Sequence, residues 1–260
     1  MGEDVPPRPA AACDRKEGFC MQELAGRVRA AADRYRMISP GDRIAVGVSG
    51  GKDSLALLCL LAELRRYYPA PFTLTALSAD PCFGGVQSDY SGIAELCRRL
   101  EVPFFVRRTA LGKIIFEERR EKNPCSLCAR MRRGILHNMA KEQSCNKLAL
   151  GHHFDDAVET FFMNLLNGGS LSCFAPKTYL SRKDLWVIRP LVFCEERDLS
   201  SLARRCHLPV VKSRCPADGN TERQRIKERI ASLEGDYPDL RAKVMGALQR
   251  AGRNGWGADL

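Results

Sequence analysis

The sequence lacks an apolar run of about 18 residues, the length that a membrane-spanning helix requires. Its N-terminal segment carries acidic and proline residues where a secretory signal has a basic segment followed by an apolar one. No repeat of about 20 to 50 residues is present, which excludes solenoids and propellers. We therefore expect a cytoplasmic protein with no membrane partner.

Acidic residues are in the minority. The chain has 31 Asp and Glu against 41 Lys and Arg, a net charge of +10 over 260 residues. A basic surface attracts phosphate groups, so nucleic acid is a candidate partner, and a merely basic soluble protein is the alternative. The 12 cysteines cannot mostly form disulfides in a reducing compartment, so a cluster of them indicates metal binding or catalysis. Cys59, Cys97 and Cys206 lie in helical apolar patterns and are expected to be buried.

Short apolar runs alternate with helical patterns along most of the chain. Residues 1–21 predict a disordered arm and residues 22–37 a helix. Strands are predicted at residues 42–48, 72–79, 102–109 and 147–151, and the helices between and after them at 54–68, 88–101, 127–143 and 153–166. This order predicts an α/β fold with a doubly wound parallel sheet.

The pattern changes after residue 168. Residues 170–191 predict a hairpin at the sheet edge with its turn at 181–184. Residues 195–207, 219–233 and 236–251 predict helices, the last two strongly basic. We expect one domain over residues 22–215 and a basic helical region over 216–260, whose charges, among them Arg223, Arg229, Arg241, Lys243 and Arg250, suit an RNA backbone.

A glycine-rich loop, "VGVSGGKDS" at residues 46–54, joins the first predicted strand to a helix. Backbone N–H groups at such a junction bind anions, and Lys52 adds a positive charge. A Walker A loop needs four residues between its first glycine and Gly-Lys, then a hydroxyl residue. Here only three residues separate Gly47 from the pair Gly51-Lys52, and Asp53 follows Lys52 in place of a hydroxyl residue. The third glycine of the dinucleotide-binding fingerprint is also missing. An ordinary turn is the remaining alternative.

The run Ser-Gly-Gly-x-Asp-Ser resembles the signature of the PP-loop ATP pyrophosphatases, which have an adenine nucleotide alpha hydrolase-like fold. The resemblance implies that ATP is a cosubstrate whose α–β bond is broken, with adenylate transferred to a substrate oxygen. The residues that would hold the pyrophosphate portion of ATP are Ser49, Gly50, Gly51, Lys52, Asp53 and Ser54.

The chain has one Cys-x-x-Cys, at Cys125 and Cys128. Two thiolates at this spacing can bind one metal centre, but a structural zinc needs four ligands and no second pair exists. A redox-active pair is another interpretation. A third is an iron–sulfur cluster bound by three cysteines. The residues alone leave these alternatives open.

Three further segments carry a second resemblance. "PCSLCARMRRGIL", "LALGHHFDDAVETFFMNLLNGG" and "VIRPL" are similar to the tRNA thiolases that make 2-thiocytidine, over most of residues 42–230. The resemblance implies a [4Fe-4S] cluster held by Cys125, Cys128 and a later cysteine, with one iron open to carry sulfur. The later cysteine should be Cys215, with Cys194 and Cys206 as substitutes. The related 2-thiouridine enzymes have zinc-binding cysteine pairs at both ends, which this sequence lacks.

The segment "GHHFDD" follows a predicted strand and should lie on the same rim as the loop. Its two carboxylates suit Mg²⁺, and helix capping by Asp155 is the alternative for that residue. The resemblance implies catalytic roles for Asp156, Arg132 and Asp53. It also implies nucleotide contacts by the following residues: Ala79, Gly151, Asp156 and Arg189.

Together these features predict an ATP-dependent tRNA sulfurtransferase. It would adenylate an anticodon-loop cytidine, at position 32, and replace O2 with sulfur. The resemblance implies a [4Fe-4S] cluster and Mg²⁺ as cofactors, and tRNA and a sulfur donor system such as a cysteine desulfurase as partners, with a homodimer left open. One alternative is a tRNA lysidine synthetase-like ligase, which shares the loop but has no use for Cys125 and Cys128. Another is a non-catalytic RNA-binding module with a structural zinc.

Overall fold

The computed structural model describes residues 15–119, 124–217 and 221–257. The first helix, α1 (Arg15–Arg34), begins inside the segment that we expected to be a disordered arm, whose first 14 residues lie outside the described part. No helix in the described part of the chain has the length and apolar character that crossing a bilayer requires.

Six strands form one sheet in the order β3-β2-β1-β4-β6-β5. They are β1 (Asp42–Gly47), β2 (Phe72–Asp80), β3 (Phe104–Arg108), β4 (Lys147–Ala149), β5 (Lys177–Leu180) and β6 (Leu185–Ile188). All neighbours are parallel except the edge strand β5, which pairs with β6 as an antiparallel hairpin. The predicted parallel α/β fold and the predicted edge hairpin are both confirmed.

Strand β1 lies at the point where the strand order reverses, because β2 follows on one side and β4 on the other. In open parallel sheets, ligands bind beyond the carboxyl ends of the strands at such a point. The glycine-rich loop leaves β1 there, and the "GHHFDD" segment leaves β4. The topology therefore brings both sequence motifs to one rim of the sheet.

Each face of the sheet has its own apolar core. Ile44 and Val46 of β1 face α1, α2 (Lys52–Leu64), α3 (Ser91–Arg99) and α7 (Glu196–Arg205). Ala45 of β1 and Leu148 of β4 face α5 (Pro124–Glu142). Consecutive residues of β1 thus point to opposite faces, which is why the strand is apolar throughout.

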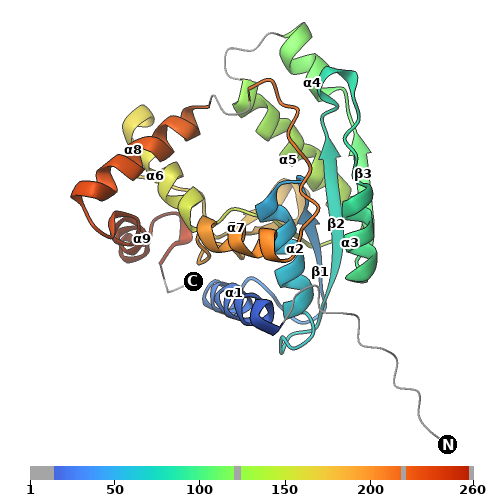
Figure 1. Ribbon diagram of the computed structural model, residues 1–260, viewed down its shortest axis with the longest axis horizontal. Coiled ribbons are helices and arrows are strands. Elements are labelled where there is room, and N and C mark those ends of the chain that lie inside the picture. The colour runs from blue at the N-terminus through green and yellow to red at the C-terminus, as the bar shows by residue number, and fades with distance from the viewer. Residues whose placement is uncertain (1–14, 120–123, 218–220, 258–260) are drawn as a thin grey trace, which may run out of the picture.

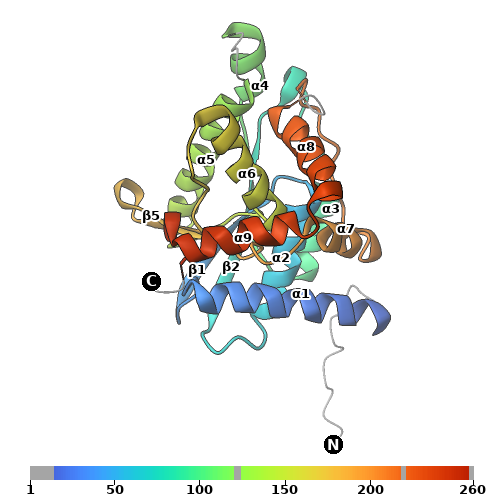
Figure 2. The same ribbon diagram turned by 90° about the vertical axis from the view of Figure 1, so that its left-hand side faces the viewer.

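The remaining long helices form a group at the side of the sheet away from β3 (Figure 1). They are α6 (Phe154–Gly168), α8 (Glu222–Asp236) and α9 (Leu240–Ala251). Ile226 and Ile230 of α8 are buried against Val158 of α6. Figure 2 shows α9 lying between α6 and α1. The fully buried Trp256, just after α9, contacts the Tyr35 ring at 6.1 Å between centroids, so the C-terminal helices are packed onto the sheet domain.

Two local differences from the sequence-based expectation have simple causes. Helix α9 starts at Leu240 rather than at residue 236, because Pro238 interrupts the helical path and Asp239 has a left-handed φ of 61°. Helix α5 starts at Pro124 rather than at residue 127, since proline is well tolerated in the first turn of a helix. The earlier start puts Cys125 on the first turn of α5, and Cys128 begins the second turn.

Candidate active site

The loop between β1 and α2 is held in shape by its own serines. Ser49 N donates a hydrogen bond to Ser54 Oγ at 3.1 Å, and Ser54 Oγ donates to Gly51 O at 2.8 Å. Gly50 has a φ of 88°, a conformation that favours glycine. Gly51, the N-cap of α2, makes no side-chain cap hydrogen bond, so N–H groups of the first turn remain available to an anion.

A cavity of 520 Å³ opens beyond this loop. Its wall is built from the loop itself, the ends of β2 and β6, the turn after β4, and helices α5, α6 and α8. The lining residues include Ser49, Gly51, Asp53, Ser54, Ala79, Ala129, Arg132, Arg133, Gly151, His152, Thr160, Phe174, Arg189 and Arg223. Among the residues expected to contact a nucleotide, Gly50, Lys52 and Asp156 do not line this cavity.

Gly151 allows the "GHHFDD" segment to lie close to the glycine-rich loop. A Cβ atom at this residue would lie 3.2 Å from both Cα and N of Ser54 and 3.3 Å from the carbonyl carbon of Asp53. These are backbone atoms, which cannot rotate out of the way. Glycine therefore allows the turn after β4 to pack directly against the start of α2.

Arginine dominates the charge of the cavity wall, where Arg132, Arg133, Arg189 and Arg223 all contribute. Arg189 is 8% exposed and donates to Ala175 O at 2.6 Å. No carboxylate in the described residues lies within ion-pair distance of Arg189, and its buried Nε has no partner there. Burial and then the neighbouring Arg133 lower the pKa of Arg189 to about 10. A buried guanidinium without a counter-charge is typical of a site that receives an anion.

Replacing Arg189 by methionine should separate stability from binding. We expect the melting temperature of the ligand-free protein to stay level or rise, because a buried unpaired charge is lost. The dissociation constant for ATP should increase about tenfold or more. Thermal unfolding and calorimetric titration measure the two effects, with the exposed Arg182→Met as control. A clear loss of stability with unchanged ATP affinity would make Arg189 a structural residue instead.

His152 lies beside this arginine. Its Nδ1 is buried without a hydrogen-bond partner among the described residues, and its ring centroid lies 5.1 Å from that of Phe174. Burial, followed by the charge of Arg189, lowers the pKa of His152 to about 4. With so low a pKa the imidazole is neutral at pH 7, and its ring lines the cavity.

Asp156 is engaged within the protein. Its Oδ2 accepts a hydrogen bond from His153 N at 3.0 Å in the capping box of α6, and its Oδ1 forms an ion pair with Arg223. Arg223 also contacts Glu159 Oε2 at 3.2 Å. The cap of α6, for which the sequence suggests Asp155, is thus formed by His153 as the N-cap residue together with Asp156. Asp155 instead accepts hydrogen bonds from Glu196 N and from Arg241 of α9.

Lys52 is held by two carboxylates. Its Nζ lies 3.0 Å from Asp53 Oδ2 and 3.1 Å from Glu196 Oε1, and Glu196 also binds Lys227 of α8. Burial opposes the charge on Lys52, but the two carboxylates overcome it and raise its pKa. Burial likewise opposes the charge on Glu196, and the two lysines overcome it, so that the pKa falls to about 2. This network joins α8 to the start of α2.

Cys125 and Cys128 lie within electrostatic range of Cys215. Burial, and next the neighbouring Cys215, raise the pKa of the Cys125 thiol. For Cys128, burial raises the pKa, Arg132 opposes the rise, and Cys215 and Cys125 add to it. Ala129, the residue after Cys128, lines the same cavity as Ser49 and Ser54. The helix that carries Cys125 and Cys128 therefore borders the cavity of the glycine-rich loop, although none of the three cysteines is among the described residues that line it.

The two substitute cysteines lie elsewhere. Cys194 is fully buried in the core, and burial raises its pKa to about 12. Cys206 is 7% exposed in the same core and is disulfide-bonded. Within the described ranges, no three His, Cys, Asp or Glu side chains already stand in ligand positions around a metal.

Sequence reasoning missed several residues of the wall and also Glu196, which does not line the cavity but binds Lys52. Arg223 was expected to contact an RNA backbone, and Phe174, Thr160 and Glu196 were given no role. Arg223 and Glu196 lie in charged helical segments that resemble any solvated helix face. Nothing in the local pattern distinguishes them, because their positions depend on how α7 and α8 pack against α2 and α6.

Comparisons with known proteins agree with this architecture. The PP-loop domain family matches residues 23–234. The tRNA-cytidine(32) 2-sulfurtransferase of Syntrophotalea carbinolica is 42% identical over 233 residues, covering 88% of this chain and 87% of that protein. The protein of the same name from Geobacter sulfurreducens is 42% identical over 223 residues, covering 85% of this chain and 86% of that protein.

A solved structure is similar as well. The U34-tRNA thiolase NcsA from Methanococcus maripaludis, solved with its [4Fe-4S] cluster, superimposes with a TM-score of 0.73 at 25% identity. The match covers 90% of this chain and 79% of NcsA. The chain therefore belongs to the PP-loop family and, within it, to the family of tRNA-cytidine(32) 2-sulfurtransferases.

Proposed function

We propose that this protein is an ATP-dependent tRNA sulfurtransferase that converts cytidine 32 of the anticodon loop to 2-thiocytidine. The observation that carries the proposal is that the helix bearing Cys125 and Cys128 lines the same cavity as the loop at residues 49–54. The names and the identity of the relatives support the same activity. An unpaired loop base suits such a site, because it can leave its stack to reach the reacting groups.

The reaction has two steps. O2 of cytidine attacks the α-phosphorus of ATP, the α–β bond breaks, and pyrophosphate leaves. A hydrosulfide then attacks C2, the C2–O bond breaks, AMP leaves with the oxygen, and the sulfur loses its proton to give the thiocarbonyl. The first step converts O2 of cytidine, a poor leaving group, into part of AMP, a good one. Pyrophosphate leaves in the first step and AMP in the second, and the site must stabilise both anions as they form.

The cavity wall provides that stabilisation. N–H groups of the loop and first turn of α2, residues 49–54, would hold the pyrophosphate portion. Arg189 and Arg132 would bind the phosphate that is transferred, and Ala79 would leave space for adenine. Asp53 is the loop carboxylate on the wall and would face Mg²⁺ together with the phosphates. Asp156 would act by fixing Arg223 at the wall.

The cysteine side chains fit an iron–sulfur cluster. Thiolates are its usual ligands, Cys215 lies within electrostatic range of Cys125 and Cys128, and the charge of Arg132 favours the thiolate of Cys128. A cluster held by these three thiolates would supply the sulfur for transfer. The residues of the cavity wall would orient ATP and the cytidine beside the helix that carries Cys125 and Cys128.

Other partners follow from the same proposal. The basic residues of α8 and α9 would contact the tRNA backbone, and a system such as a cysteine desulfurase would supply the sulfur. The protein would act in the cytoplasm, and a homodimer is compatible with the site described above.

Nucleoside mass spectrometry of tRNA tests the function directly. A strain that lacks the gene should lose 2-thiocytidine, and the intact gene should restore it. Loss of lysidine instead would favour a lysidine synthetase-like ligase. A purified protein that contains stoichiometric zinc, and that releases no pyrophosphate from ATP with tRNA present, would favour a zinc-containing RNA-binding module.

A further inference from the structure

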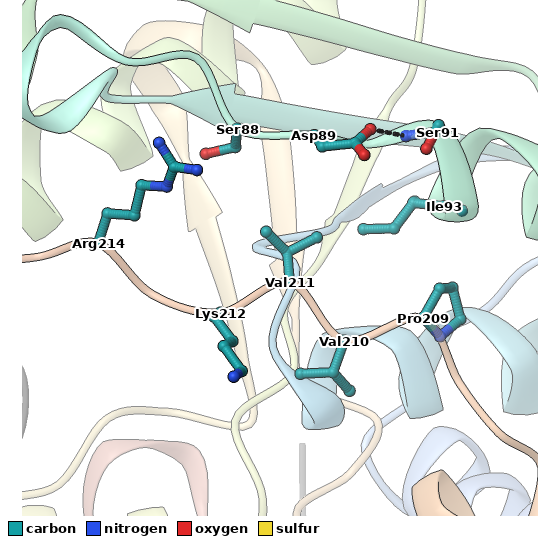
Figure 3. A pocket seen from close by; sticks show the side chains of 10 residues that line it. Ser88, Asp89, Ser91, Ile93, Pro209, Val210, Val211, Lys212 and Arg214 are labelled. Atoms are coloured by element: carbon teal, nitrogen blue, oxygen red, sulfur yellow. Dashed lines mark hydrogen bonds between the residues drawn. The ribbon is translucent and has the colours of Figure 1, made fainter.

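An extended segment leads from the end of α7 to Cys215. We name residues 208–217 the strap, because this segment has no helix or strand and crosses the glycine-rich loop. In Figure 1 it is the orange trace that rises from α7 past α2 toward α5. Figure 3 shows it passing beneath residues 88–93, with Arg214 turned toward Ser88 and Lys212 turned away.

Two glycines bring the strap against the sheet domain. A Cβ atom at Gly92 would lie 2.8 Å from Cβ of Pro209, and one at Gly50 would lie 3.0 Å from Cβ of Val211. Real Cβ atoms do not come as close as the contact at Gly92, and the one at Gly50 would push Val211 away by a few tenths of an ångström. Glycine at both positions therefore lets the strap pack closely here. Val211 N also donates a hydrogen bond to Gly50 O at 3.0 Å. The strap is therefore anchored on the loop that is expected to bind ATP.

The strap is much less constrained after Val211. Lys212, Ser213 and Arg214 are exposed, and the hydrogen bond from Cys215 N to Ser213 Oγ at 3.2 Å is local. Four residues of extended chain span at most about 14 Å, so the Val211 anchor limits where Cys215 can lie. On the far side, Arg223 of α8 is tied to Asp156.

We propose that Val211 is a positioning residue for Cys215, and that its contact with Gly50 couples the ATP-binding loop to the third cluster ligand. The inference depends on the proposed function, since it assigns a task to a neighbour of the cluster ligands. A shift of Gly50 on nucleotide binding would displace Val211 and, through the four residues of chain that follow, the thiol of Cys215. Binding of ATP and the environment of the cluster are then linked.

Replacing Val211 by glycine tests the anchor, and Val210→Gly is a matched control. Both substitutions give the strap the same additional freedom, but Val210 is 49% exposed and its side chain does not contact Gly50. We expect Val211→Gly to lose its cluster in air about tenfold faster than the wild type, as followed by visible absorbance and iron content. Val210→Gly should match the wild type, and both variants should bind ATP within about threefold of it.

The link between ATP binding and the environment of the cluster can be measured separately. A non-hydrolysable ATP analogue should change the electron paramagnetic resonance spectrum of the reduced cluster in the wild type and in Val210→Gly, but much less in Val211→Gly. Circular dichroism checks folding, and Val211→Ala is the milder variant if the glycine variant does not fold. Equal cluster lifetimes and equal spectral responses in all variants would overturn the inference alone. A wild type that binds no cluster would overturn the proposed function as well.

Discussion

Replacing Cys215 by alanine should abolish 2-thiocytidine in tRNA while ATP binding stays near the wild-type level. The thiol lies within electrostatic range of Cys125 and Cys128, whereas the ATP loop is built from residues 49–54, which keep their own hydrogen bonds. With two thiolates left, the cluster loses a ligand and should fall below detection in visible absorbance. Complementation of the deletion strain, followed by nucleoside mass spectrometry, measures the product.

Cys145→Ala is the matched control, because Cys145 follows the other end of α5 and is buried in the core beneath it. This variant should retain thiolation, with only the modest loss of stability that removing a small buried group causes. Full activity of Cys215→Ala would refute the assignment of the third ligand. Loss of ATP binding in that variant would mean that its defect is not specific to sulfur transfer.

Gly151→Ala should weaken ATP binding at least about tenfold without unfolding the protein. The new methyl group would lie 3.2 Å from backbone atoms of Ser54, so the turn after β4 and the start of α2 must move apart. Moving the anion-binding N–H groups by a fraction of an ångström misaligns them with the phosphates, and such small displacements are costly in a preorganised site. Calorimetric titration with ATP and pyrophosphate release in the presence of tRNA measure the effect.

Gly26→Ala is the control for this substitution. Gly26 lies on the exposed side of α1, and a Cβ there would meet nothing within 4 Å. Alanine should stabilise this helix by about 0.5–1 kcal/mol and leave ATP binding unchanged. If Gly151→Ala bound ATP as tightly as Gly26→Ala, the close contact at the rim would have no role in shaping the nucleotide site.

The fold could be predicted because its signals are local. Apolar runs such as Ile44–Val46 mark strands that are buried on both faces, and helical periodicity separates them, so the parallel sheet follows. The loop at 49–54 was likewise recognisable from consecutive residues at a strand-to-helix junction. Its position on the same rim as Gly151 follows from the rule for parallel sheets.

Other parts of the site could not be predicted, because they depend on long-range packing. Glu196 binds Lys52 across a separation of 144 residues, and Arg223 binds Asp156 across 67. In the sequence, Glu196 and Arg223 look like ordinary charged residues on the surface of a helix. The sequence also could not show which of Asp155 and Asp156 takes part in the cap of α6. A capping box depends on the backbone geometry of His153, which the sequence does not reveal.

The arginines of the cavity wall also bear on how a catalytic cycle ends. Positive charges that draw in a triphosphate also attract the leaving diphosphate, and four arginines line this cavity: Arg132, Arg133, Arg189 and Arg223. Release of pyrophosphate, rather than adenylation or sulfur transfer, would then limit turnover. Inorganic pyrophosphate added from outside would act as an inhibitor that competes with ATP, and a pyrophosphatase in the same compartment would keep the enzyme cycling.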